Sequence, residues 1–172
     1  MKSKSIQLIN IFLRYFFLLI LALNPNIFYL IFVYPTKYLS YYFLNIFYET
    51  SLIGEILIFN GVTIEIIPSC IAPAAYLLLF ILVFSIGPLG IASRIKLLVF
   101  SCFIFFFVNL FRIIFLILLY PSPYFFQIHF IIWHVLSTLF IIIIWFINIK
   151  LFKINKIPFY SDIKYFYLKI KK

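Results

Sequence analysis

Four long stretches of this 172-residue chain are almost free of charged side chains, and this feature restricts the possible fold most. They cover residues 6–23, 70–87, 97–119 and 126–149, and each is 18 residues or longer. A helix of about 18 residues or more crosses the roughly 30 Å of hydrocarbon in a bilayer. Charged residues make up only 10% of the chain, whereas soluble domains carry about 25%. The sequence therefore predicts an all-α integral membrane protein, a bundle of about four transmembrane helices.

The extent of the first span has two interpretations. It covers residues 6–23 if Pro25 terminates the helix, or residues 6–34 if the helix continues past Pro25 as a kink. A short or re-entrant element within residues 27–48 would add a fifth membrane element. Two lysines precede the span as in a signal peptide, but no small-residue cleavage site follows. We therefore expect an uncleaved signal anchor.

Residues 35–69 differ in character from the four stretches. They contain glycine, proline and three of the four acidic residues of the chain. Residues 62–66 alternate apolar and polar side chains, which predicts a strand. Irregular backbone exposed to lipid would leave amides and carbonyls without partners. We expect an outward-facing interfacial segment of surface helix and short extended pieces.

The distribution of lysine and arginine predicts the orientation of the spans. The N-terminus, the loop 87–96 and the segment 150–172 together carry eleven of the 14 basic residues. Such residues collect on the cytoplasmic side of membrane proteins. The chain is therefore expected to be one multi-pass domain of the cell membrane, with both termini cytoplasmic and the 24–69 segment and the 119–125 turn outside. The basic tail 150–172 then contacts anionic membrane lipids rather than nucleic acid.

Polar residues within the spans fall at one depth. Arg112 lies seven residues before Leu119, which is roughly 10 Å below the outer surface. Asn109 lies one turn earlier on the same helix face, which favours a polar interior stripe. His134 lies eight residues into the last span, at a similar depth, whereas His129 is expected to be a surface residue near the headgroups. A buried arginine is costly and therefore needs a partner or a function.

Cys70 follows Ser69 at the outer start of its helix, where the positive end of the helix dipole favours a thiolate. Cys102 precedes Arg112 by ten residues, about 15 Å toward the cytoplasm, and is expected to pack inertly. The sequence therefore predicts that Cys70, Arg112 and His134 share the outer leaflet.

This set of residue types suits nucleophilic acyl transfer. The Cys70 thiolate would attack a carbonyl, His134 would move a proton, and Arg112 would stabilise the thiolate or the oxyanion. Cysteines and histidines at scattered depths do not form a tetrahedral metal site. The chain has no phosphate-binding glycine loop, dinucleotide fingerprint, serine-hydrolase elbow or zinc-protease motif. No metal and no cofactor are expected.

Three short motifs resemble the archaeosortase/exosortase family of membrane transpeptidases, which use a Cys, Arg and Arg-or-His triad. They are residues 64–70 (IEIIPSC), 108–113 (VNLFRI) and 133–134 (WH), and the likeness covers about residues 60–145. Many relatives have a glycine-rich stretch after the cysteine, where this chain has residues 71–75 (IAPAA).

The resemblance implies a function and a substrate class. Catalytic residues would be Cys70, Arg112 and His134, with Asn109 and Ser69 in support. The substrates would be surface proteins with a C-terminal sorting signal, which consists of a short motif, a transmembrane helix and a basic tail. After cleavage, a Cys acyl-enzyme would transfer the protein to a lipid or other surface acceptor.

Two other functions stay open. One is a non-enzymatic membrane assembly or scaffold protein of the same fold. The other is a small transporter or channel subunit with Arg112 on its path. Transport predicts polar residues through the full thickness of the bilayer, but the cytoplasmic half here is almost entirely isoleucine, leucine and phenylalanine.

Overall fold

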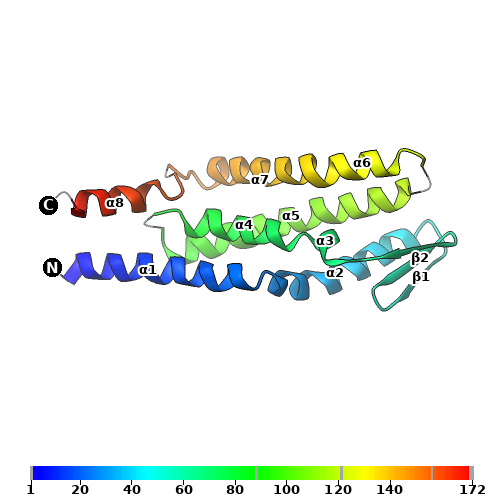
Figure 1. The fold of residues 1–172 in the computed structure, drawn as a ribbon, viewed down its shortest axis with the longest axis horizontal. Coiled ribbons are helices and arrows are strands. Elements are labelled where there is room, and N and C mark those ends of the chain that lie inside the picture. The colour runs from blue at the N-terminus through cyan, green and yellow to red at the C-terminus, as the bar shows by residue number, and fades with distance from the viewer. Residues whose placement is uncertain (1, 88, 121, 156, 171–172) are drawn as a thin grey trace.

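The computed structural model describes the backbone of residues 2–87, 89–120, 122–155 and 157–170, and side chains between residues 7 and 168. The chain is 74% helical and elongated, with most helices along the long axis (Figure 1). Its elements, in chain order, are α1 (Lys2–Leu23), α2 (Asn26–Asn45), β1 (Thr50–Ile53), β2 (Ile56–Phe59), β3 (Val62–Glu65), α3 (Pro68–Ile71), α4 (Pro73–Phe84), α5 (Ile91–Leu119), α6 (Phe125–Ile131), a π-helical turn (Ile132–Leu136), α7 (Ser137–Leu151) and α8 (Tyr160–Ile170).

Two of the described helices are long and apolar enough to cross a membrane. They are α5, with 29 residues, and the continuous helix Phe125–Leu151, with 27 residues. A third candidate is Gln7–Leu23 together with Asn26–Asn45, which meet at a 65° bend. Pro25 stands at this bend, where its ring interrupts the helical hydrogen-bond ladder. The predicted helical fold with apolar spans is thus confirmed for two to three helices, and Pro68–Phe84 is a shorter apolar helix.

The prediction of an all-α fold needs a correction between α2 and α3. Three short antiparallel strands form a sheet in the order β1-β2-β3. The predicted strand at residues 62–66 is confirmed as β3. Asn60 and Gly61, with φ of 46° and 76°, form the β2–β3 turn, and this pair suits a tight hairpin because both positions need positive φ. The segment 35–69, for which a surface helix and short extended pieces were expected, thus consists mainly of the end of α2 and this sheet.

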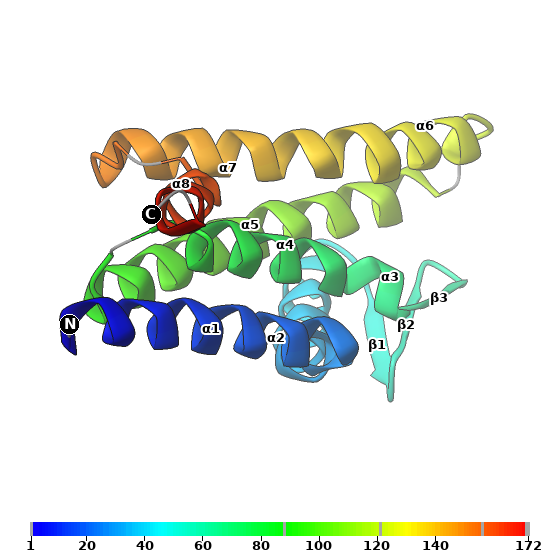
Figure 2. The same cartoon turned by 60° about the vertical axis from the view of Figure 1, so that its left-hand side comes forward.

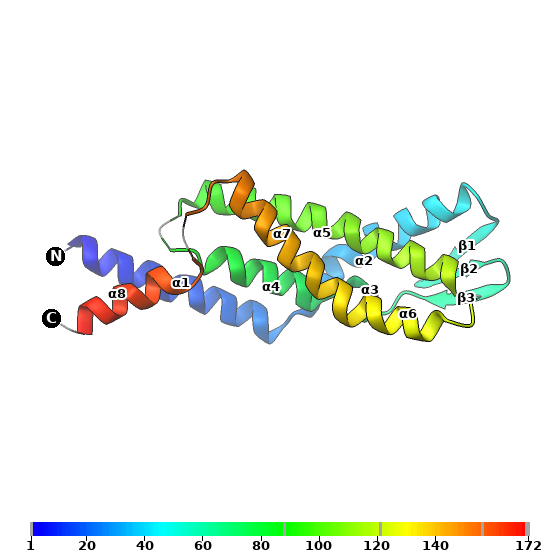
Figure 3. The same ribbon diagram turned by 90° about the horizontal axis from the view of Figure 1, so that it is seen from above.

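Successive helical segments run back and forth along the long axis (Figure 1). Both described ends of the chain and the α4–α5 connection lie at one end of the molecule, and the sheet and the α5–α6 turn lie at the other (Figures 1 and 2). Seen from above, α6 and α7 cross over α5 and α4 (Figure 3). The largest fully buried side chains at the centre are Tyr76 and Phe105, whose rings meet edge to face at 4.9 Å.

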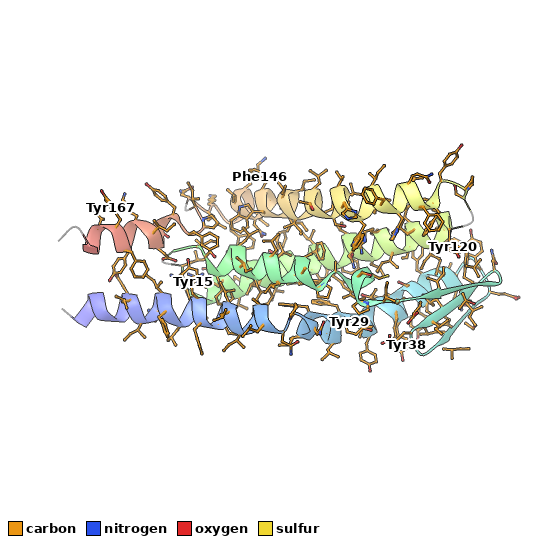
Figure 4. All side chains as sticks on the ribbon, viewed as in Figure 1. Tyr15, Tyr29, Tyr38, Tyr120, Phe146 and Tyr167 are labelled. Carbon is orange, nitrogen blue, oxygen red and sulfur yellow. The ribbon has the colours of Figure 1, made fainter. Side chains whose placement is uncertain are left out.

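The outer surface of the helices is largely apolar. Side chains project outward along the whole length of the molecule, and most of their atoms are carbon (Figure 4). Phe146 on the outer side of α7 is 64% exposed, and Phe103 and Phe111 on α5 are 62% and 64% exposed. A soluble monomer rarely exposes apolar surface of this extent, which suits a lipid environment.

Two arginines close the C-terminal end of α4. Arg94 is buried and donates hydrogen bonds of 2.7–3.1 Å to the carbonyls of Val83, Phe84, Ile86 and Gly87. Arg14 of α1 donates to the Phe84 and Ile86 carbonyls at 3.0 and 2.8 Å. The last carbonyls of a helix lack helical partners, and in an apolar environment these guanidinium groups take the place of water.

The C-terminal segment 150–172, predicted as a basic tail, contains a docked helix. Arg14 forms a bidentate ion pair with Asp162 of α8 at 2.9 Å. The amide of Phe159 donates to the Ser85 carbonyl at 2.8 Å. A Cβ atom on Gly87 would overlap Ser161, so glycine permits this close approach.

We expect Arg94→Met to lower the free energy of unfolding by about 3 kcal/mol, because it leaves several buried carbonyls without donors. Thermal unfolding in detergent micelles measures this loss. Lys96→Met removes an equal charge from an exposed position on the same helix and should change stability by less than about 0.5 kcal/mol. Equal losses in the two variants would contradict the capping role.

Candidate functional site

The first turn that carries Cys70 cannot complete its own backbone hydrogen bonds. Helix α3 spans only Pro68–Ile71 and ends at Ala72, whose φ of 58° is left-handed. Pro73 follows and has no N–H, so the Ser69 carbonyl cannot receive the usual bond from four residues ahead. The Pro68 carbonyl accepts from the Ala72 amide at 3.2 Å, but the Ser69 carbonyl needs a donor from outside this turn.

Helix α5 supplies these donors. Asn109 Nδ2 donates to the Cys70 carbonyl at 2.9 Å and to the Ile71 carbonyl at 3.4 Å. Arg112 Nη2 donates to the Cys70 carbonyl at 2.8 Å and to the Ser69 carbonyl at 3.4 Å. Both side chains are buried. The predicted interior stripe of Asn109 and Arg112 is confirmed, and it explains why Cys70 lies against α5.

Arg112 also ties α5 to the last long helix. Its Nη1 donates to Ser137 Oγ at 2.8 Å, and Ser137 Oγ donates in turn to the Ile132 carbonyl at 3.2 Å. The Nε atom of Arg112 has no hydrogen-bond partner among the described residues, although it is buried. One donor of this guanidinium is therefore uncommitted.

A cavity of about 470 Å³ opens beside Cys70. Its walls come from β3 and the residues that follow it, from the outer part of α5, and from α6 with Trp133 of the π-helical turn. The lining residues are Thr63, Ile64, Glu65, Ile66, Ile67, Ser69, Cys70, Arg112, Ile113, Leu116, Ile117, Tyr120, Phe125, His129 and Trp133. The wall is mostly apolar, with a thiol, a guanidinium, a carboxylate and an imidazole set into it.

The histidine at this cavity is His129, whereas the sequence-based choice is His134. His134 is exposed, its Nδ1 lies 3.1 Å from the Phe130 carbonyl oxygen, and it does not line the cavity. His129 stacks on Phe125 with ring centroids 5.4 Å apart and faces the cavity that holds Cys70. The sequence-based expectation is therefore corrected: His129, and not His134, lines the cavity with Cys70.

The π-helical turn at Ile132–Leu136 is the physical reason for this correction. In a regular helix counted back from buried Ile141, His134 would lie within about 20° of the buried face and His129 about 120° away from it. A π turn takes up one additional residue, a rotation of about 100°. This shift brings half-buried His129 to the face that lines the cavity and turns His134 away.

Cys102 lies apart from this cavity. It is half-buried on α5 and packs against the main hydrophobic core, as the sequence predicts for an inert cysteine. Cys70 is the cysteine that lines the cavity. Within the described ranges, no three His, Cys, Asp or Glu side chains come together as a metal site.

The sequence analysis places His129 at the surface and assigns no function to Trp133 or Ser137. One signal was present in the sequence: Phe125, His129 and Trp133 follow one another at intervals of four, which places three rings on one helix face. Phe125, His129 and Trp133 all line the cavity, and their rings stack with centroids 5.4 and 6.4 Å apart. The position of the π turn itself has no comparable signal in the sequence.

Three comparisons with known proteins give no assignment for this chain. No family model, no curated protein and no solved structure matches it. The functional argument therefore depends on the residues at the cavity and on the chemistry that they can perform.

The geometry of the two histidines can be tested by cross-linking in the Cys102→Ala protein. We expect His129→Cys to be joined to Cys70 by a bifunctional thiol reagent that is long enough to cross the cavity. His134→Cys is the matched control and should stay unlinked, because the π turn directs this position away from Cys70. Linkage of position 134 in preference to 129 would contradict the π turn, and peptide mass spectrometry identifies the linked pairs.

Proposed function

We propose that this protein is a membrane cysteine protease or transpeptidase of the archaeosortase/exosortase type. It would cleave the C-terminal sorting signals of surface proteins and transfer them to a lipid or other surface acceptor. The observation that carries this proposal is one mostly apolar cavity that Cys70, Arg112 and His129 line together. A nucleophile, a fixed cation and a proton carrier around one cavity are the parts that acyl transfer requires.

The proposed membrane arrangement has four passes, with Pro68–Phe84 as the shortest. The remaining passes are α1 with the start of α2, α5, and the helix from α6 through α7. Lysine and arginine collect at the end that holds the termini, which favours a cytoplasmic position for this end. The cavity, the sheet and three of the four acidic residues then face outside.

The proposed reaction has two balanced steps. In the first, His129 accepts the Cys70 thiol proton as the sulfur attacks the scissile carbonyl carbon, and returns it to the nitrogen of the leaving peptide as the C–N bond breaks. A thioester on Cys70 results. In the second, an amine or hydroxyl of the acceptor attacks this thioester, and its proton returns to the sulfur through His129.

Arg112 acts first as a positioning residue. Its Nη2 binds the backbone on either side of the reactive thiol, and its Nη1 binds Ser137 on the helix that carries His129. Its Nε is without a partner among the described residues, so we assign it to the negative charge that develops on the attacked carbonyl oxygen. Asn109 supports the same turn, and Ser69 contributes its carbonyl.

The alternative of a non-enzymatic membrane scaffold has one observation in its favour. Among the described residues, the hydrogen bonds of Asn109 and Arg112 run to backbone carbonyls or to Ser137, as a purely structural pair would make them. A scaffold would tolerate loss of the thiol and the imidazole, provided that these two side chains remain. A transporter subunit is less favoured, because the arginines Arg14 and Arg94 at the opposite end are occupied by carbonyls and Asp162.

Processing of a substrate distinguishes these alternatives. The substrate is a co-expressed, tagged surface protein that ends in a short motif, an apolar helix and a basic cluster. We expect Cys70→Ala to abolish its cleavage, because no other group at the cavity forms a thioester. His129→Ala should lower the cleavage rate by about 10²–10⁴-fold through loss of proton transfer.

His134→Ala and Cys102→Ala are the matched controls and should leave cleavage close to the unsubstituted level. Cleavage is read from the electrophoretic shift of the tag, and the amount of folded enzyme is measured in the same membranes. A thioester on Cys70 is detected by its release with hydroxylamine. Cleavage that survives Cys70→Ala would refute the mechanism.

The proposed orientation is tested by a membrane-impermeant thiol reagent on intact cells. In a protein with Cys70→Ala and Cys102→Ala, Ser51→Cys in β1 should react from outside, because it is exposed on the sheet. Ser93→Cys at the start of α5 is exposed at the opposite end and should react only after permeabilisation. The reverse pattern would invert the topology.

A further inference from the structure

Among the described residues, no further strand pairs with the outer edge of β3, and this strand forms one wall of the cavity. The sheet order places β1 and β3 at the two edges. Helix α2 packs against β1 and β2, whereas β3 and the residues after it line the cavity beside Cys70. An uncovered edge strand is a template for a further strand.

The backbone groups on this edge can be identified from the register. In an antiparallel ladder, alternate residues bond to the neighbouring strand and the others direct their N–H and C=O outward. The amide of Ile66 donates to the Glu55 carbonyl at 2.9 Å, so Ile66 belongs to the inward-bonding set. By alternation, Thr63 and Glu65 direct their amides and carbonyls to the free edge.

The side chains beside this edge favour a basic partner. Thr63 and Glu65 are exposed on one face of the strand, and Val62 and Ile64 lie half-buried on the other. Glu65 is the carboxylate in the cavity lining, and Glu49 and Glu55 lie beside the same sheet. Lys37 near the sheet is buried and donates to the Gly54 carbonyl at 3.1 Å. A cross-strand neighbour of Glu65 on an added strand would therefore meet negative charge.

We infer that the outer edge of β3 binds an extended peptide as a fourth strand, with a basic side chain opposite Glu65. Alternate side chains of this peptide point to opposite faces, so apolar ones lie on the face of Ile64. β3 leads directly into the turn of Cys70, and the added strand thereby presents its backbone to the thiol. In these terms, which rest on the proposed function, the peptide is the segment of the substrate next to the scissile bond.

Binding by strand addition has a signature with a period of two. The probe is a short fluorescein-labelled peptide of alanine, valine and threonine with one lysine, and the protein is the full chain with Cys70→Ala in lipid nanodiscs. N-methylation of a peptide amide that faces β3 removes one hydrogen bond and should weaken binding by roughly tenfold. Methylation of the intervening amides should have little effect on fluorescence anisotropy titrations. Weakening without this alternation would overturn strand addition.

The charge preference is tested by changing the charge of the peptide side chain and, separately, that of Glu65. The lysine peptide should bind about fivefold more tightly than the same peptide with glutamate. Glu65→Lys should reverse this preference. Glu49→Lys makes the same charge change beside the β1 edge and should retain it. An unchanged preference in Glu65→Lys would overturn the assignment of Glu65.

A proline variant blocks the edge without breaking the sheet. Thr63→Pro removes an outward N–H that β2 does not use, which edge strands tolerate, and it should abolish the alternating pattern while thermal unfolding stays unchanged. If N-methylation weakens binding at alternate amides but no Cys70-dependent cleavage is found, the transpeptidase is refuted and strand addition is supported. If Cys70-dependent cleavage is found without this alternation, the transpeptidase is supported and strand addition is refuted.

Discussion

Backbone carbonyls that interrupted helices leave without partners are the constraint on which this structure depends. The chain breaks its helix at Ala72 and ends α4 among apolar side chains. A buried unpaired carbonyl costs several kcal/mol where no water can reach it. Arg112 and Asn109 pair the carbonyls around Cys70, and Arg94 with Arg14 pairs those at the end of α4. The few arginines of this apolar chain are thus placed where helices stop.

The same hydrogen bonds assemble the candidate site. Because Asn109 and Arg112 hold the Cys70 carbonyl, the thiol is fixed at the wall of the cavity and does not follow the motion of a surface loop. Arg112 also holds Ser137, which sets the rotation of the helix that carries His129. A structural and a catalytic function of Arg112 are therefore compatible: positioning the turn is the larger part, and the proposed oxyanion contact uses the donor that remains.

Charge divides the two ends of the molecule. The chain carries a net charge of +10, but three of its four acidic residues lie in or beside the sheet. At the opposite end, Asp162 binds Arg14 and docks α8 onto α1. Most polar groups at each end bind nearby backbone; Glu65 lines the cavity, and the buried Nε of Arg112 has no partner among the described residues. This separation is what gives the proposed peptide edge its preference for a basic side chain.

Much of the fold could be predicted from local sequence properties. Apolar runs of sufficient length predict helices, the alternation at residues 62–66 predicts β3, and the spacing of Asn109 and Arg112 predicts one interior face. Cys70 at a helix start and Cys102 in the core follow from the same counting. These properties depend on residues a few positions apart, so a single sequence contains them.

Which histidine lines the cavity with Cys70 could not be predicted from such local properties. Depth follows from helical rise, and both histidines are near the outer end, but rotation depends on the π turn at Ile132–Leu136. Ile132 within this turn and Ile141 beyond it are both buried. The sequence by itself determined that the chain is helical and apolar and that Cys70 and Arg112 lie at one level. The tertiary structure decided that His129 lines the same cavity as these two residues and that β3 forms one of its walls. Both depend on contacts between segments far apart in the chain.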